Sequence, residues 1–153
     1  MASREAKLST VMALFDAFGE LDAEAFVSHL TEDVIMRPSA FVTGESEYRG
    51  HREVVESFDV IAKDLEREGK TLHLRPHALY VDRDDEDRVL ALGELTIIRD
   101  GGEPFGTEVA YLHRMSGDKV AEVWTWLDHE EGLRQLAAPE EVKLPRGGRL
   151  RRG

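Results

Sequence analysis

Two side chains of this 153-residue chain are its strongest candidates for chemistry, His77 and Arg37. A neutral imidazole in apolar surroundings can accept or release a proton near pH 7. A guanidinium can bind an enolate, carboxylate or phenolate oxygen and stabilise the negative charge that develops on it. Each residue also has a structural interpretation, His77 as a half-buried residue beside Pro76 and Arg37 as the partner of a carboxylate. We predict catalytic roles for both residues, and the structural interpretations stay open.

A second set of side chains could position a ligand. Glu108 could act as a base for the imidazole or as a partner for the guanidinium, and solvent exposure is the alternative for a strand glutamate. Thr125 could orient a ligand oxygen, and the phenols of Tyr48 and Tyr111 could donate hydrogen bonds to one. The predicted apolar lining of the same site consists of Met12, Phe15, Leu95 and Leu127.

The sequence contains no arrangement typical of a metal site. There is no cysteine, so disulfides and thiolate ligands are excluded. Asp128, His129 and Glu130 are consecutive residues and cannot converge on one ion. His73 and His77 lie four residues apart on a predicted strand, which separates them by about 13 Å. We therefore expect no metal and no other cofactor.

Helices are predicted where apolar residues recur at helical spacing. This spacing predicts helices over 3–18 and 51–68, and Asp22 begins a shorter helix that ends near Leu30. Residues 38–50 are predicted to form a loop or short hairpin. Strand-forming residues between turn residues predict strands over 33–37, 71–82, 87–98, 104–115 and 119–127.

The stretch from Gly117 to Leu136 organises the predicted fold. Its strand ends at Asp128, which together with Glu131 has the pattern of a capping box and begins a short helix. Helices followed by an antiparallel meander and a closing helix are typical of an α+β fold. We predict three N-terminal helices packed against a curved, mainly antiparallel sheet.

Strand alternation predicts which side chains face the helices. On residues 87–98 the wholly apolar set should face inward: Val89, Ala91, Gly93, Leu95 and Ile97. On the last strand the inward set should be Val123, Thr125 and Leu127. Trp124 and Trp126 would then lie on the outer face, with Tyr111 and His113 beside them, and would form a homodimer surface. The alternative is that both tryptophans belong to the core.

Composition excludes several classes of function. The net charge of −11 repels phosphate backbones, so we expect no nucleic-acid partner. No apolar run approaches the roughly 20 residues of a membrane span, and the N-terminus has no apolar signal-peptide segment. We expect a cytoplasmic protein with one domain over residues 1–137. Residues 138–153 are basic and are predicted to be a disordered tail.

Several short motifs occur in a recognisable order. After the glycine turn the chain has Lys119-Val120, Glu122, Trp124, Asp128 and Gln135-Leu136, and earlier it has Glu32-Asp33-Val34 and Tyr48-Arg49-Gly50. This order resembles the SnoaL-like polyketide cyclases of the nuclear-transport-factor-2-like superfamily, over about residues 5–137. The resemblance implies a cone whose curved sheet wraps a long helix. It says less about function, since this fold hosts isomerases, dehydratases, cyclases, epoxide hydrolases and binding proteins.

Three groups of relatives suggest roles for individual positions. Where ketosteroid-isomerase relatives have a general-base aspartate before a proline, this chain has Arg37. Where scytalone-dehydratase relatives have a histidine, this chain has His77, although their Tyr-Asp pair is Phe18-Gly19 here. The Asp–Arg–Asp group of limonene-epoxide-hydrolase relatives falls on Leu95, Gly93 and Thr125, which cannot activate water.

Two hypotheses follow from these positions. The first is a cofactor-independent enzyme that cyclises, isomerises or dehydrates a hydrophobic, oxygenated small molecule, in which His77 transfers the proton and Arg37 holds the oxyanion. The second is a non-catalytic module that binds a small molecule or forms a dimer. The second is favoured if either residue lies outside the cone.

Overall fold

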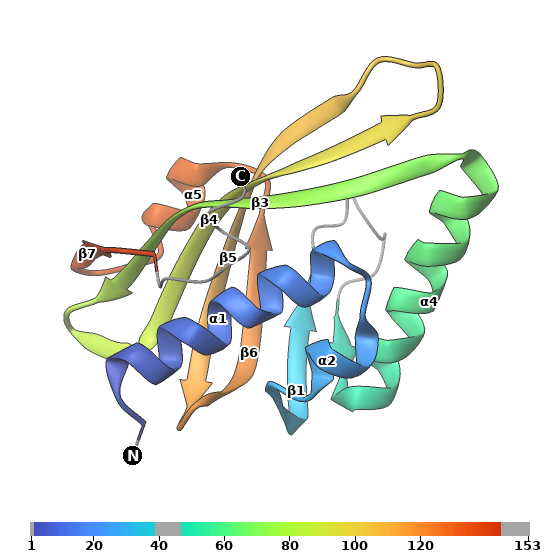
Figure 1. Cartoon of the computed structure of the whole chain (residues 1–153). Helices are drawn as coiled ribbons and strands as arrows, with labels where there is room; N and C mark the ends of the chain where they lie inside the picture. The colour runs from blue at the N-terminus through green and yellow to red at the C-terminus, as the bar shows by residue number, and fades with distance from the viewer. Residues whose placement is uncertain (1, 39–46, 145–153) are drawn as a thin grey trace.

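The N-terminal helices lie together on one side of the protein. The structure is a computed structural model that describes residues 2–38 and 47–144 (Figure 1). α1 (Arg4–Gly19) begins at Ser3, whose hydroxyl accepts a hydrogen bond from the Ala6 N–H. α2 (Ala23–Val27) begins at Asp22 and is shorter than predicted, because the chain enters a strand at Leu30. α4 (Gly50–Glu68) ends at Gly69, whose φ of 65° is the left-handed conformation expected at such a stop.

A long meander forms most of the sheet. Its strands are β3 (Lys70–Asp82), β4 (Asp85–Arg99), β5 (Phe105–Ser116) and β6 (Lys119–Trp126). The shorter strands are β1 (Leu30–Arg37), β2 (Tyr48–Arg49) and β7 (Pro139–Val142). The described residues form one seven-stranded sheet in the order β2-β1-β6-β5-β4-β3-β7. β1 runs parallel to β6 and the other neighbours are antiparallel, so the predicted mainly antiparallel sheet is confirmed. Within the loop predicted for 38–50, residues 39–46 lie outside the described part of the chain.

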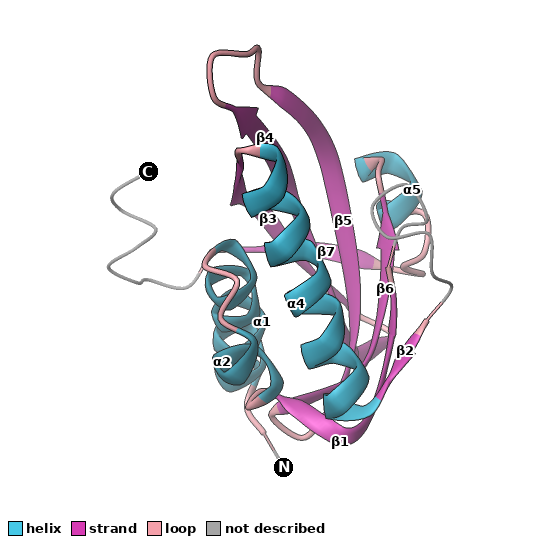
Figure 2. Ribbon diagram, turned by 90° about the vertical axis from the view of Figure 1, so that its right-hand side faces the viewer, coloured by secondary structure: helices cyan, strands magenta, loops and turns pink. Residues whose placement is uncertain are grey.

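The helices are divided between the two faces of the sheet. α1, α2 and α4 cover the concave face, and the long strands bend around them (Figure 2). α5 (His129–Leu133) lies on the other face, where Leu133 and Leu136 pack against Leu90, Leu92 and Ala110. Asp128 accepts a hydrogen bond from the Glu131 N–H at 3.1 Å, as the capping pattern predicts. Gly132 allows the close approach of α5, since a Cβ there would lie 2.5 Å from the Ala110 Cβ.

The inward-facing side chains predicted from strand alternation are correct on β4 and β6 and wrong on β5. Val89 and Ala91 of β4 face the helices, and Val123 and Thr125 of β6 face inward as predicted. Trp124 and Trp126 are half-buried and pack with the apolar residues between α5 and the sheet, here called the outer cluster: Leu90, Leu92, Ala110, Leu112, Leu133 and Leu136. The homodimer surface stays a prediction. The orientation predicted for β5 is wrong. Val109, Tyr111 and His113 point inward, whereas Ala110 and Leu112 belong to the outer cluster. The residues on both faces of β5 are apolar enough to be buried, so alternation alone could not show which face points towards the helices.

The chain remains ordered beyond the predicted domain end at residue 137. β7 pairs with β3 and extends that edge of the sheet. Asp82, at the end of β3, accepts hydrogen bonds from the backbone N–H groups of Ala137 and Ala138 at 3.0 and 3.1 Å. The predicted disordered tail from 138 is therefore wrong for residues 138–144, and residues 145–153 lie outside the described part.

None of the helices in residues 2–38 and 47–144 combines the length and apolar character that crossing a membrane requires. The cytoplasmic location stays a prediction.

Candidate functional site

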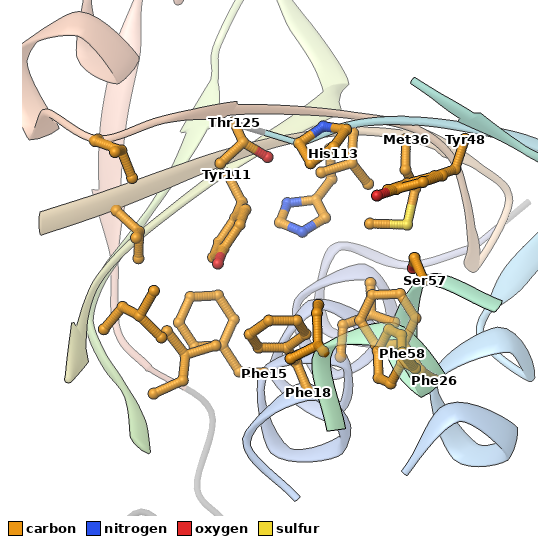
Figure 3. A pocket seen from close by; sticks show the side chains of 18 residues that line it. Phe15, Phe18, Phe26, Met36, Tyr48, Ser57, Phe58, Tyr111, His113 and Thr125 are labelled. Atoms are coloured by element: carbon orange, nitrogen blue, oxygen red, sulfur yellow. The ribbon is translucent and has the colours of Figure 1, made fainter. Parts of the chain in front are cut away.

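A hollow lies between the concave face of the sheet and helices α1, α2 and α4. Its space for the centres of water-sized molecules is about 80 Å³, several times the roughly 10–15 Å³ that one water needs. Its described lining is Leu14, Phe15, Phe18, Phe26, Met36, Pro38, Tyr48, Ser57, Phe58, Ile61, Leu74, Leu95, Val109, Tyr111, His113, Val123, Thr125 and Leu127. Figure 3 shows Tyr111 and His113 projecting towards the phenyl rings of the helices.

Most of the predicted ligand-positioning residues meet at this hollow. Six of them line it: Phe15, Tyr48, Leu95, Tyr111, Thr125 and Leu127. Met12 and Glu108 are the exceptions, because neither is among the lining residues, and Met12 is buried in the core. Gly93 positions Phe15, since a Cβ at residue 93 would lie 2.8 Å from the phenyl ring and 2.6 Å from the Arg75 carbonyl oxygen.

His113, like Tyr111, is a polar residue that the sequence prediction placed on the wrong face. Its side chain is buried, with 3% of its surface exposed. Its Nδ1 lies 3.0 Å from the backbone carbonyl oxygen of Val89. A carbonyl oxygen can only accept, so Nδ1 carries the proton and Nε2 keeps a free lone pair. Burial lowers the pKa of His113 to about 4, so the imidazole is neutral at pH 7.

Tyr111 lies two residues before His113 on the same face of β5. Its ring packs edge-on against Phe15 at 5.5 Å and lies 6.4 Å from the His113 ring, measured between centroids. Burial raises the pKa of Tyr111 above its ordinary value, so the hydroxyl keeps its proton and can donate it. No residue in the described ranges forms a hydrogen bond with this hydroxyl, whereas Ser57 on α4 already donates to the Val54 carbonyl at 2.6 Å.

The inward location predicted for His77 is wrong. A bulge in β3 between Pro76 and Ala78 puts His77 on the outer face, where it is exposed. Its ring centroid lies 6.0 Å from that of His129 at the start of α5. Glu108 is also on this face. Its side chain is 58% exposed, and it accepts a hydrogen bond from the His129 N–H at 2.9 Å instead of pairing with His77 or Arg37.

Arg37 also lies outside the hollow. Its neighbour Met36 points inward, so Arg37 points to the outer face, where it pairs with Glu122 at 2.9 Å. Its guanidinium also stacks on Trp124, 4.9 Å from the ring centroid. Burial alone would raise the pKa of Glu122, but hydrogen bonds from Arg114 and Arg37 hold it below its ordinary value. Of the two interpretations of Arg37, the structure therefore agrees with the one in which it pairs with a carboxylate, that of Glu122.

Metal ligation has no support in residues 2–38 and 47–144. No group of three or more histidine, cysteine, aspartate or glutamate side chains there could hold an ion. The site is instead a mostly apolar hollow in which His113 can accept a hydrogen bond and Tyr111 can donate one.

Comparison with solved structures shows the fold that this chain shares with other proteins. TerC, crystallised with polyporic acid, has a TM-score of 0.65 at 16% identity, over 86% of this chain and 97% of TerC. RV0760c from Mycobacterium tuberculosis, in complex with estradiol-17β-hemisuccinate, has a TM-score of 0.63 at 16% identity, over 82% and 95% of the two chains. A Pseudomonas putida protein provisionally described as a polyketide cyclase has a TM-score of 0.57 at 19% identity, over 90% and 99%. The shared architecture is the nuclear-transport-factor-2-like α+β fold.

A family model identifies the chain more closely. The model of the SnoaL-like domain matches residues 11–123, which include the C-terminal part of α1, all of α4 and the meander as far as Val123 in β6. The chain therefore belongs to the SnoaL-like domain family. No curated protein sequence matches it.

Proposed function

We propose that this protein binds a small, largely hydrophobic molecule that carries oxygen groups. The observation that carries the proposal is the pair of His113 and Tyr111 in a wall that is mostly apolar. The free Nε2 lone pair of His113 can accept a hydrogen bond from a ligand hydroxyl, and the Tyr111 hydroxyl can donate one to a ligand carbonyl oxygen. An apolar hollow with a few convergent polar groups is the usual form of a small-molecule site.

Two structural neighbours suggest the first probes. TerC was crystallised with polyporic acid, and RV0760c was solved in complex with estradiol-17β-hemisuccinate. Both ligands are organic molecules with oxygen groups, and 2-naphthol is a smaller probe of the same general kind. Naphthalene is its matched control, because it has the same rings without the hydroxyl.

Filling the hollow should abolish binding. Thr125 lines the hollow from β6, and Thr125→Phe adds a phenyl ring to that space. We expect 2-naphthol at about 100 times its Kd to stabilise the wild-type protein by about 2.7 kcal/mol, which raises Tm by several degrees. Thr125→Phe should lose this increase. Thr71→Phe, the same change at an exposed position of β3, should keep it. Equal Tm increases in the two variants would contradict the proposal.

A second candidate function is the proton-transfer enzyme predicted from the sequence, with different residues. His113 and Tyr111 both line the hollow, with their ring centroids 6.4 Å apart, and Nε2 of His113 is the ring nitrogen left without a hydrogen bond to the Val89 carbonyl. His113 would take a proton from a carbon next to a ligand carbonyl, and the C–H electron pair would form an enolate. The enolate oxygen would accept a hydrogen bond from Tyr111. The pKa of about 4 makes His113 a weak base, so we rank binding above catalysis.

Deuterium exchange into 2-tetralone, a hydrophobic ketone with acidic C–H groups, tests this second function. General-base catalysis typically contributes 10²–10⁴-fold, and the lowered pKa of His113 reduces our expectation to about tenfold. NMR in D₂O would measure the exchange rate with the wild-type protein and with His113→Asn, whose amide can still donate to the Val89 carbonyl. The same rate with both proteins would leave binding as the function.

A further inference from the structure

The hollow lacks a charged partner for an ionic ligand. No aspartate, glutamate, lysine or arginine is among its described lining residues. The charged side chains of the neighbouring strands pair with one another on the outer face instead: Arg37 and Arg114 with Glu122, and Arg75 with Glu94. Burying an ion without such a partner is strongly unfavourable.

Three titratable groups face the hollow in the described lining: Tyr48 from β2, and Tyr111 and His113 from β5. The lining residues from α1, α2 and α4 include no titratable group. The Nδ1–H of His113 is engaged by the Val89 carbonyl, so the atom of this ring that remains for a ligand is the Nε2 acceptor, while the Tyr111 hydroxyl remains as a donor. A phenolate or carboxylate oxygen would face this lone pair and be repelled. A ligand hydroxyl can donate to it.

We propose that the hollow binds its ligand in the uncharged form, with the proton of a phenolic or enolic hydroxyl retained and donated to Nε2 of His113. This inference rests on the proposed function and specifies its ligand class as neutral hydroxylated ring compounds and enols. The net charge of −11 acts in the same direction, because it disfavours the approach of anions.

The spectrum of 4-nitrophenol tests this inference, because the ionised and neutral forms absorb at different wavelengths. With saturating wild-type protein, we expect the apparent pKa of the probe to rise by about one unit, since the site favours the neutral form. A fall in this pKa, or no change while the probe is bound, would overturn the inference. A fall would mean that the hollow stabilises an oxyanion.

Variants separate this inference from the proposed function. Thr125→Phe should abolish both 2-naphthol binding and the pKa shift of 4-nitrophenol, whereas Thr71→Phe should keep both. If 2-naphthol binds in the Thr125-dependent way but the 4-nitrophenol pKa falls, the inference alone fails. If neither probe binds the wild-type protein, both proposals fail.

His113→Asn tests the assigned acceptor. We expect it to weaken binding of neutral 4-nitrophenol about fivefold, which is the effect of losing one hydrogen bond. Binding of nitrobenzene, which lacks the hydroxyl, should be unchanged. Equal weakening of the two probes would overturn the assignment of the acceptor to Nε2.

Discussion

Between about pH 6.5 and pH 4, the wild-type protein should lose roughly 3 kcal/mol more unfolding free energy than the His113→Asn variant. The pKa of His113 is about 4 in the folded protein, because the ring is buried, and its ordinary value is 6.5. Between these values the unfolded chain binds a proton that the folded protein does not. Acid therefore favours unfolding in this range, and the full stability returns above about pH 6.5.

Urea unfolding at a series of pH values would measure this difference. Asp82 and Glu122 also have lowered pKa values, but they are present in both proteins, so their contributions cancel in the comparison. His73→Asn removes an exposed histidine of β3 and controls for the loss of a histidine as such. Parallel pH dependence in the wild-type protein and His113→Asn would show that His113 is not held neutral in the core.

Asp82→Asn should lower the free energy of unfolding by about 3 kcal/mol at pH 7. The Asp82 carboxylate is 1% exposed and accepts hydrogen bonds from the N–H groups of Asp84, Ala137 and Ala138. Burial alone would raise the pKa of Asp82, but these three donors and Arg88 hold it below its ordinary value. Asparagine keeps one acceptor oxygen and puts N–H donors in place of the other, so a backbone N–H loses its partner.

Chemical denaturation at pH 7 would measure the loss, and hydrogen exchange would locate it. The amides of Ala137 and Ala138 should exchange faster in Asp82→Asn, because β7 loses its attachment to the end of β3. Asp84→Asn, an exposed change in the same turn, should alter stability by less than about 0.5 kcal/mol. Unchanged stability in Asp82→Asn would mean that these hydrogen bonds do not hold the C-terminal segment.

Local sequence patterns were sufficient to predict the meander and the helices. The strands of the meander are separated by turn residues, such as Gly117 with a φ of 65° between β5 and β6. The helical spacing and the caps at Asp22 and Asp128 have direct counterparts in the structure. Turns and helix caps depend on residues that are close together in the chain, so they can be predicted from the sequence alone.

The candidate site was harder to predict because its features depend on contacts between distant segments. α5 buries the outer face of the sheet, so apolar residues occupy both faces of β5 and alternation does not identify the inward side of His113. His77 lies at a single bulge in β3 and faces outward. The sequence gives no sign of this bulge except the neighbouring Pro76. β7 depends on Asp82, 55 residues before Ala137, so it has no local pattern.

Nitrogen NMR of the His113 imidazole during a 2-naphthol titration would test most directly whether the hollow is a ligand site with a neutral acceptor. We predict that Nε2 has no proton in the free protein at pH 7. Its signal should move towards that of a hydrogen-bonded nitrogen as 2-naphthol saturates the wild-type protein and Thr71→Phe, but not Thr125→Phe. A protonated Nε2, or an unchanged His113 signal in protein saturated with 2-naphthol, would contradict the account.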